Sequence, residues 1–307
     1  MRRQAIALAC DRAYAPYTTR LAARLAATHP QRTFDICIFS TENFELPQAC
    51  REAGVILHTL SNLDAIPAAA AAGRHGIATY IRLLIPELEG IDYGRILYLD
   101  TDIVCEHGGL DGLLDAEMGD HCIGAVRDNK QWRSPRRRVP EFVATRQANL
   151  PYFNAGVLLI HTEGWRQREI GARAIRALVD CPQAILHSDQ SALNIVVRGE
   201  WAEMSPIWNW QYTHASRFFV ELVEPRLIHF IGPTKPWNDS SGKLPGRFRR
   251  FFQPDDTPPT GPTWPANLRQ SLWKHYLSSG AMKTYLDRFE HPWQLRDAAS
   301  DAPLARG

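Results

Sequence analysis

Short apolar runs that end at polar residues recur through the first hundred residues, and they constrain the fold more than any other feature. Gln4 to Cys10, Thr33 to Ser40 and Gly54 to Leu60 each have the length and composition of a buried strand. Between the first two lies Pro16 to Thr28, whose leucines and alanines recur at helical spacing before Pro30. Strands that alternate with helices in this way predict an α/β protein built on a mostly parallel sheet.

Further apolar runs and helical patterns extend this alternation beyond residue 78. The sequence contains neither G-x-G-x-x-G nor G-x-x-x-x-G-K-[ST], so it has no dinucleotide fingerprint and no P-loop. Any phosphate must therefore be held by a metal and by side chains. The remaining predicted elements are a helix at 78–88, a strand at 96–99, a strand at 157–160 entered through a tight turn at Phe153-Asn154-Ala155-Gly156, a helix at 191–197 and a strand at 227–231.

Two acids close the predicted strand Ile96 to Leu99. Asp100 and Asp102 follow it directly, with Thr101 between them, and ligands of open α/β sheets gather at the carboxyl ends of strands. Residues i and i+2 of an extended chain point the same way, so the two carboxylates can converge on one point. Paired carboxylates suit a hard divalent cation, which in turn neutralises a diphosphate. The alternative interpretation is an ordinary strand-end turn.

The composition is that of a globular protein, with 307 residues, 45% apolar and 22% charged. A formal charge of +2 is too small to argue for a nucleic-acid partner. The six cysteines form no C-x-x-C pair, and Cys10 and Cys37 lie in apolar runs, which favours a reducing cytosol over a disulfide framework. No run approaches the ~20 apolar residues of a membrane span. We therefore expect a cytoplasmic protein, soluble or peripheral.

The composition changes after Pro245, where we expect the main domain to end. Residues 246–307 then form an extension, in which Pro254 to Pro265 has the composition of a linker. Two short amphipathic helices are predicted after the linker. The first carries Leu268, Leu272, Trp273, Tyr276 and Leu277, and the second carries Met282, Tyr285, Leu286 and Phe289.

Polar residues that follow the other predicted strands, or interrupt the helices, complete a recognisable set. Its members are Asp11, Arg82, Asp100-Thr101-Asp102, Asn154-Ala155-Gly156, Asp189-Gln190 and His229-(x)5-Lys235-Pro236-Trp237. Over residues 4–240 the set resembles family-8 glycosyltransferases, retaining nucleotide-sugar enzymes that include lipopolysaccharide galactosyl- and glucosyltransferases and glycogenin. The resemblance implies a Rossmann-like nucleotide-sugar-binding domain of the GT-A type, here residues 1–245, with a small helical C-terminal extension.

The resemblance also implies a role for each matched residue. Two carboxylates and one imidazole fit Mn²⁺, with Mg²⁺ as the alternative. Each residue has an ordinary structural interpretation too, such as a core histidine for His229, a solvated loop lysine for Lys235 or a helix cap for Asp11. The implied metal ligands are Asp100, Asp102 and His229; the implied donor-binding residues are Asp11, Tyr14, Arg82, Asp100, Thr101, Asn154, Ala155, Gly232 and Lys235; and the implied catalytic residues are Gln190 and Asp189.

The implied function is metal-dependent, retaining transfer of glucose or galactose from a UDP-sugar to a saccharide acceptor, a lipopolysaccharide or other glycolipid core. Amides are poor nucleophiles, so we expect the acceptor to attack on the same face of the sugar as the leaving group, steered by Gln190. The alternative mechanism is a covalent intermediate on Gln190 or Asp189. Ala13 stands where the family commonly has Asn, which makes strict uridine recognition less secure. The alternatives are a capsular or protein glycosyltransferase, a nucleotidyltransferase, or an inactive sugar-nucleotide-binding protein.

Arginines gather in two stretches that the family motifs do not explain. Arg133, Arg136, Arg137 and Arg138 form one, and Arg247, Arg249 and Arg250 form the other. Both are interpreted either as solvated loops or as surfaces for an anionic acceptor or a membrane. The second interleaves with aromatic residues, which favour the bilayer headgroup level. We therefore hypothesise that the tail docks on the inner leaflet of the cytoplasmic membrane, against the alternative that its aromatics pack on the domain or pair two subunits.

Overall fold

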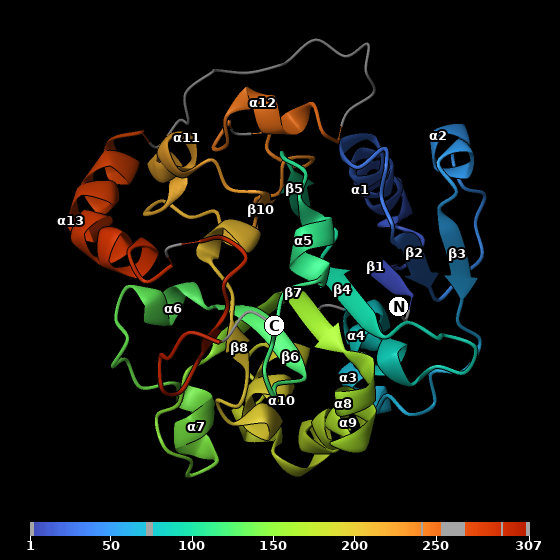
Figure 1. Cartoon of the computed structure of the whole chain (residues 1–307), viewed down its shortest axis with the longest axis horizontal. Helices are drawn as coiled ribbons and strands as arrows, with labels where there is room; N and C mark the ends of the chain where they lie inside the picture. The colour runs from blue at the N-terminus through green and yellow to red at the C-terminus, as the bar shows by residue number, and fades with distance from the viewer. Residues whose placement is uncertain (1–2, 72–75, 241, 253–267, 290, 305–307) are drawn as a thin grey trace.

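The computed structural model describes residues 3–71, 76–240, 242–252, 268–289 and 291–304, with an eight-stranded sheet at its centre (Figure 1). The strands of this sheet are β1 (Gln4–Cys10), β2 (Asp35–Ser40), β3 (Ile56–Thr59), β4 (Arg95–Leu99), β6 (Ile123–Arg127), β7 (Phe153–His161), β8 (Ala202–Glu203) and β11 (Arg296–Asp297). They lie in the order β11-β8-β6-β7-β4-β1-β2-β3, and only β7 and β11 run opposite to the rest. The expected mostly parallel α/β sheet is confirmed.

Helices flank the sheet, and one predicted helix is interrupted. The helix expected at 78–88 consists of a 3-10 turn, one α-helical turn and a second 3-10 turn. The α-helical turn ends before Pro86, because proline has no N–H to donate. The helices are α1 (Ala15–Thr28), α2 (Gln48–Glu52), α3 (Ala68–Ala71), η1 (Ile77–Tyr80), α4 (Ile81–Leu84), η2 (Ile85–Glu87), α5 (Leu110–Leu114), α6 (Asn129–Trp132), α7 (Pro140–Ala144), α8 (Thr162–Gln167), α9 (Ile170–Asp180), η3 (Pro182–Ala184), α10 (Ser188–Val197), η4 (Pro206–Trp208), η5 (Arg217–Phe219), α11 (Val220–Val223), α12 (Gly246–Arg249) and α13 (Leu268–Leu286).

Alternate side chains of the central strands enter two separate hydrophobic cores. On β1, Ile6 and Leu8 face a core that α1 and α5 cover, whereas Ala5 and Ala7 face a core that α4, α9 and α10 cover. Both faces of the strand are therefore buried, which explains its nearly continuous apolar sequence. Polar groups are left to the strand ends, where the chain leaves the sheet.

A second, smaller sheet holds the C-terminal segment against the domain. It consists of β5 (Ile103–Cys105), β10 (Leu227–His229) and β9 (Trp210–Gln211), with β10 antiparallel to β5 and parallel to β9. Phe248 and Tyr285 are buried in the same core as Trp210 and Phe230. The last strand, β11, then pairs with β8 at the edge of the main sheet.

Two local predictions are wrong. The predicted turn at Phe153 to Gly156 is instead the first part of β7, because these residues pair with β6 across a register shift between Ala125 and Val126. The two predicted C-terminal helices are one continuous helix, α13. The predicted linker at Pro254 to Pro265 lies outside the described residues. The domain boundary at residue 245 stays a prediction.

None of the described helices is both long and apolar enough to cross a membrane.

Candidate active site

Asp100 and Asp102 lie just beyond the carboxyl end of β4, as the sequence predicts. The second sheet brings His229 to them, because β10 pairs with β5 in a register that sets His229 opposite Ile103. His229 Nε2 lies 3.1 Å from Asp102 Oδ1 and 3.7 Å from Asp100 Oδ2. One ligand atom from each of the three residues falls within 4.8 Å of the other two. Residues far apart in sequence therefore converge on one point.

This triad fits a divalent cation on two observations. Oxygen ligands together with one imidazole nitrogen suit Mn²⁺ or Mg²⁺. The space beside the triad is kept open by Gly156, since a Cβ there would lie 2.8 Å from Asp100 Oδ2 and would collide with the His229 ring. A glycine is thus required at position 156, because β7 passes too close to His229 and Asp100 for a side chain.

Lys235 pairs with the second acid of the triad. Its Nζ contacts Asp102 Oδ2 and donates to the Phe230 carbonyl at 2.6 Å. Burial alone would raise the pKa of Asp102, but the charges of His229 and Lys235 outweigh burial and hold that pKa below its ordinary value. Asp102 therefore stays ionised and available as a ligand.

Arg82 bridges the triad and α10. Its guanidinium lies 2.7 Å from Asp100 Oδ1 and 3.0 Å from Asp189 Oδ2, above the Tyr98 ring at 4.4 Å. It also donates to the Ala155 carbonyl at 2.7 Å. Burial opposes the charge of Arg82, but the two carboxylates outweigh it and raise the pKa of the guanidinium. The sequence expectation that this buried arginine must face a partner is confirmed.

Asp189 is an acid of the site whose pKa is raised, in contrast to Asp102. It is buried at the first turn of α10. Burial raises its pKa to about 6; Arg82 opposes this shift, and the nearby Asp100 adds to it. A carboxyl group with such a pKa changes charge near neutral pH.

A row of hydrogen-bonded side chains, which we call the amide row, joins the triad to α6. His229 Nδ1 donates to Asn209 Oδ1 at 3.0 Å, and Asn209 Nδ2 donates to Asn154 Oδ1 at 2.8 Å. Asn154 Nδ2 donates to Gln190 Oε1 at 3.1 Å, and Gln190 Nε2 donates to Asp128 Oδ2 at 3.3 Å. Asp128 can only accept, and the backbone N–H groups of Ala155 and Gly156 donate to the oxygens of Gln190 and Asn154, so these contacts together set the direction of the amides. His229 Nε2 consequently remains for a cation.

Aromatic rings form a second cluster around Trp237, two residues after Lys235. Trp237 stacks on Tyr17 with centroids 4.2 Å apart and meets the edge of Tyr14 at 6.1 Å. Tyr14 is 44% exposed, and its backbone N–H donates to Asp11 Oδ1 at 2.9 Å. Asp11 and Tyr14 are thus linked to the Lys235 segment through a ring contact.

Most of the predicted site residues are brought together; Asp11 and Tyr14 lie in the aromatic cluster instead, and Thr101 and Gly232 take other places. The Thr101 hydroxyl contacts Thr18 at 3.0 Å and donates to the Ala9 carbonyl at 3.3 Å, so it braces β4 against β1 and α1. Gly232 lies in open space, since an added Cβ there meets nothing within 4 Å. The residues that do converge are Arg82, Asp100, Asp102, Asn154, Ala155, Asp189, Gln190, His229 and Lys235.

Sequence reasoning missed three participants. Asp128 directly follows β6, so the strand-end argument that identified Asp100 could have found it. Asn209 lies between two buried tryptophans and carries no charge, and Tyr98 has the pattern of a core residue within an apolar strand. Neither residue gives a signal in a single sequence.

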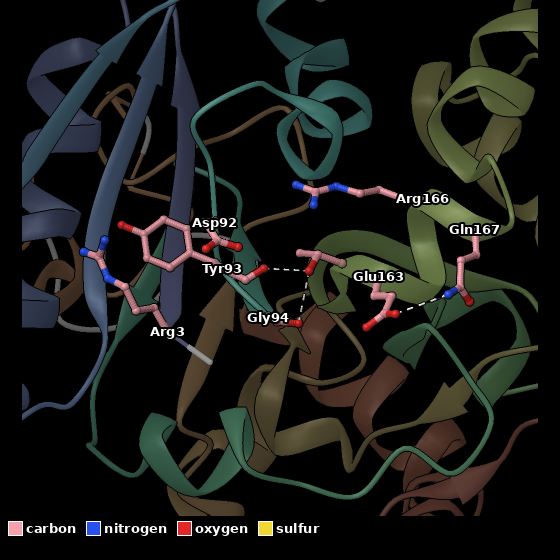
Figure 2. Close-up of a pocket in the computed structure, with 8 residues that line it drawn as sticks. Arg3, Asp92, Tyr93, Gly94, Glu163, Arg166 and Gln167 are labelled. Atoms are coloured by element: carbon pink, nitrogen blue, oxygen red, sulfur yellow. Dashed lines mark hydrogen bonds between the residues drawn. The ribbon is translucent and has the colours of Figure 1, made fainter. Parts of the chain in front are cut away.

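A cavity of about 530 Å³ opens at the other end of the strands, opposite the candidate site (Figure 2). It is lined by Arg3, Gly94 and Thr162, at the start of β1 and β4 and the end of β7. Arg3 pairs with Asp35, and Arg166 donates to the Ile91 carbonyl at 3.0 Å. Because its guanidinium groups are already engaged by the protein, this cavity is not the candidate site.

Comparisons with known proteins agree with this geometry. The family model described as Glycosyl transferase family 8 matches residues 5–241. The Lipopolysaccharide 1,3-galactosyltransferase of Salmonella typhimurium is 32% identical over 173 residues, which cover 52% of this chain and 49% of that protein. The Lipopolysaccharide glucosyltransferase WaaO of Escherichia coli is 30% identical over 55% of this chain and 51% of its own length. The matched region spans about half the length of these relatives.

Solved structures give the same fold. The galactosyltransferase LgtC, solved in complex with donor and acceptor sugar analogs, superposes with a TM-score of 0.63 at 26% identity and covers 81% of this chain and 95% of that one. The glycosyltransferase GlyE of Streptococcus pneumoniae superposes with a TM-score of 0.59 over 93% of this chain and 64% of its own, at 20% identity, which supports the fold alone.

Proposed function

Because the chain belongs to glycosyl transferase family 8, we propose that it is a retaining, metal-dependent enzyme that transfers glucose or galactose from a UDP-sugar to a saccharide acceptor. The observation that carries the proposal is the convergence of Asp100, Asp102 and His229 beside Lys235. The similarity to lipopolysaccharide galactosyl- and glucosyltransferases supports a hexose donor and a lipopolysaccharide or other glycolipid core as the acceptor.

The diphosphate end of the donor would lie at the triad. Asp100, Asp102 and His229 would hold Mn²⁺ or Mg²⁺, which supplies positive charge to a diphosphate leaving group. Lys235, now paired with Asp102, is placed to donate to a phosphate oxygen in the same space. Charge stabilisation of the leaving group is expected to be the largest contribution to catalysis.

The sugar end of the donor would lie between Arg82 and Gln190. The oxygen of Gln190 already accepts hydrogen bonds from Asn154 Nδ2 and from the Ala155 N–H, both at 3.1 Å. An amide oxygen engaged twice is a weak nucleophile, and Asp189 is buried against Arg82. The geometry therefore favours Gln190 as a group that steers the acceptor, with attack on the face that the diphosphate leaves.

The uridine would lie by Asp11 and Tyr14. The exposed Tyr14 ring, beside Trp237, offers an aromatic surface for a base. Asp11 would accept from the nucleoside through the oxygen that its own bond to the Tyr14 N–H leaves available. Ala13, between them, adds no polar contact.

Peripheral contact with the inner leaflet of the cytoplasmic membrane is the remaining part of the proposal, and α13 is the surface that supports it. On α13, Trp273 is 63% exposed and Tyr276 is 72% exposed, with Leu272 and Leu277 exposed beside them. Such aromatic residues favour the headgroup region. The arginine-rich stretch 247–252 is less suited than the sequence implies, because Phe248 is buried.

A panel of UDP-hexoses tests the proposed function. With Mn²⁺ and no acceptor, slow hydrolysis of UDP-glucose or UDP-galactose is expected, and it should stop on addition of EDTA. With glycolipid core saccharides as acceptors, NMR of the first-formed product should show an α-linkage from the α-linked donor. A β-linkage would contradict retention, and equal turnover in EDTA would contradict a role for metal.

A further inference from the structure

The segment from Lys130 to Arg138, which we call the basic loop, carries five cations in nine positions. They are Lys130, Arg133, Arg136, Arg137 and Arg138. Arg136, Arg137 and Arg138 are exposed, while Lys130 and Arg133 are half-buried. Across the described part of the chain, none of these four arginines forms an ion pair with a carboxylate. The loop therefore presents a concentrated positive charge that the protein does not neutralise.

Two amides hold the backbone of this loop in a defined shape. The buried Gln131 donates from Nε2 to the Arg137 carbonyl at 3.4 Å and to the Leu150 carbonyl at 3.1 Å. The exposed Asn149 donates from Nδ2 to the Arg136 carbonyl at 3.3 Å, and its Oδ1 accepts from the Val139 N–H at 3.2 Å. Arg133 donates to Asn129, whereas the side chains of Arg136, Arg137 and Arg138 take no part in these bonds, and their charges face solvent.

Like charges also lie close together in the basic loop. Burial lowers the pKa of Arg133 and the neighbouring Arg137 lowers it further, while Asp128 opposes the shift. A bound anion would relieve the repulsion between Arg133 and Arg137. Guanidinium forks also match the oxygens of phosphate and carboxylate.

The inner end of the basic loop is bonded to the candidate site. Asp128, which caps α6, accepts from Gln190 Nε2 at 3.3 Å. Lys130 contacts His187, three residues before Gln190. Gln190 thus lies between the triad, which it reaches through the amide row, and the basic loop. The donor diphosphate belongs to the triad end, so the loop end faces the acceptor.

We propose that the basic loop binds an anionic group, a phosphate or a carboxylate, carried by the acceptor saccharide. The proposal rests on the proposed function and adds the chemical class of the acceptor to it. In this arrangement the acceptor hydroxyl lies beside Gln190, and the anionic substituent contacts the exposed guanidinium groups of Arg136, Arg137 and Arg138. Salt weakens the charge attraction between them.

The test uses three probe sugars of matched size: glucose 6-phosphate, glucuronate and glucose. Binding is measured by calorimetry on the full chain with UDP and Mn²⁺, at low and at high salt. The intact protein should bind at least one anionic probe about tenfold more tightly than glucose. The variant Arg136→Ala/Arg137→Ala/Arg138→Ala should lose that preference, and the matching three-lysine variant should keep part of it, because it retains the charge without the guanidinium forks.

The control variant Arg51→Ala/Arg168→Ala/Arg176→Ala removes the same charge from exposed positions on α2, α8 and α9 and should leave the preference intact. Hydrolysis of UDP-hexose without acceptor should be equal in all variants; its absence in the intact protein would contradict the proposed function instead. Equal binding of the three probes by the intact protein, or a preference that survives in the loop variant, would overturn the inference. So would a loop variant that loses only binding to anionic vesicles, since the loop would then be a membrane surface.

Discussion

Two clusters of buried charge in this molecule differ in how completely their groups are paired. In the first, which we call the Glu203 network, Glu203 is fully buried and accepts from Arg127 at 2.9 and 2.6 Å. It also accepts from Arg288 at 3.1 and 2.8 Å, and Asp301 balances the second guanidinium from 2.5 Å. Arg296 also pairs with Asp301 at 2.8 Å, so two carboxylates meet three cations, and both oxygens of Glu203 are engaged.

The second cluster, at the candidate site, has more acid than base. Asp100, Asp102 and Asp189 face Arg82 and Lys235, and His229, the remaining basic group, must be neutral to hold a metal ion. Within the described ranges, Asp102 Oδ1 and Asp189 Oδ2 are buried without a hydrogen bond of good geometry. A surplus of buried negative charge is costly unless a cation joins it. The contrast teaches that the paired charges of the Glu203 network stabilise the fold, whereas the candidate site has unpaired carboxylate charge that a metal ion can neutralise.

The largest expected effect is on activity at the site. Asp102→Ala should lower transfer at least a thousandfold, roughly 4 kcal/mol in activation free energy, because a metal ligand is lost. The protein should stay folded, with a lower melting temperature because Lys235 loses its partner. The Asp100→Ala variant should behave alike, and Asp115→Asn, near the start of β1, should stay active. An Asp102→Ala protein that retains full transfer in EDTA would break the comparison.

The matching change in the Glu203 network should act on stability. Glu203→Gln leaves two buried guanidiniums facing a neutral amide, so the free energy of unfolding should fall by about 3 to 5 kcal/mol. Chemical denaturation measures the loss, and donor hydrolysis per folded molecule should be unchanged. Asp301→Asn, whose side chain is 50% exposed, is the milder control and should cost under about 1 kcal/mol. Equal losses in the two variants would mean that Glu203 is not the centre of the network.

A pH series separates the clusters further. Because the folded protein raises the pKa of Asp189 to about 6, it keeps a proton there that the unfolded chain loses near pH 4. Asp189 therefore contributes a decrease in stability as pH rises from about 4 to about 6, of at most roughly 3 kcal/mol. In EDTA, Asp189→Asn should flatten that slope. Asp102, whose pKa is lowered, contributes stability that is lost only as pH falls below about 4.

The smallest effect concerns the C-terminal segment, which the Glu203 network holds through Arg288. Deleting residues 262–307 would remove Arg288 and β11 together, so substitutions on the outer face of α13 are the better probe. Trp273→Ser/Tyr276→Ser should weaken binding to anionic vesicles severalfold with unchanged stability and donor hydrolysis. The control Val179→Ser/Leu186→Ser changes exposed apolar residues elsewhere and should bind as before. Unchanged vesicle binding in the first variant would leave the segment with a structural role alone.

The sequence predicts those parts of the site that depend on strand ends. Asp100 and Asp102 are found this way because a buried strand must expose its polar residues where it stops. The turn predicted at Gly156 is wrong because the glycine serves a close approach to His229, a contact made across two sheets. The Glu203 network gives no signal at all, since its members come from β6, β8 and the C-terminal segment and meet only after folding.

The amide row carries a consequence for what the site can tolerate. Each of its amides has its oxygen on one side and its NH₂ on the other, so reversing one would set like against like at the next contact. Such a reversal would pass from neighbour to neighbour until it reached His229 and exchanged the roles of its two ring nitrogens. The row does not conduct a proton, but the orientation of each amide constrains the orientation of the next. Asp128, together with the backbone N–H groups of Ala155 and Gly156, thereby fixes which nitrogen of His229, on the other sheet, faces the triad.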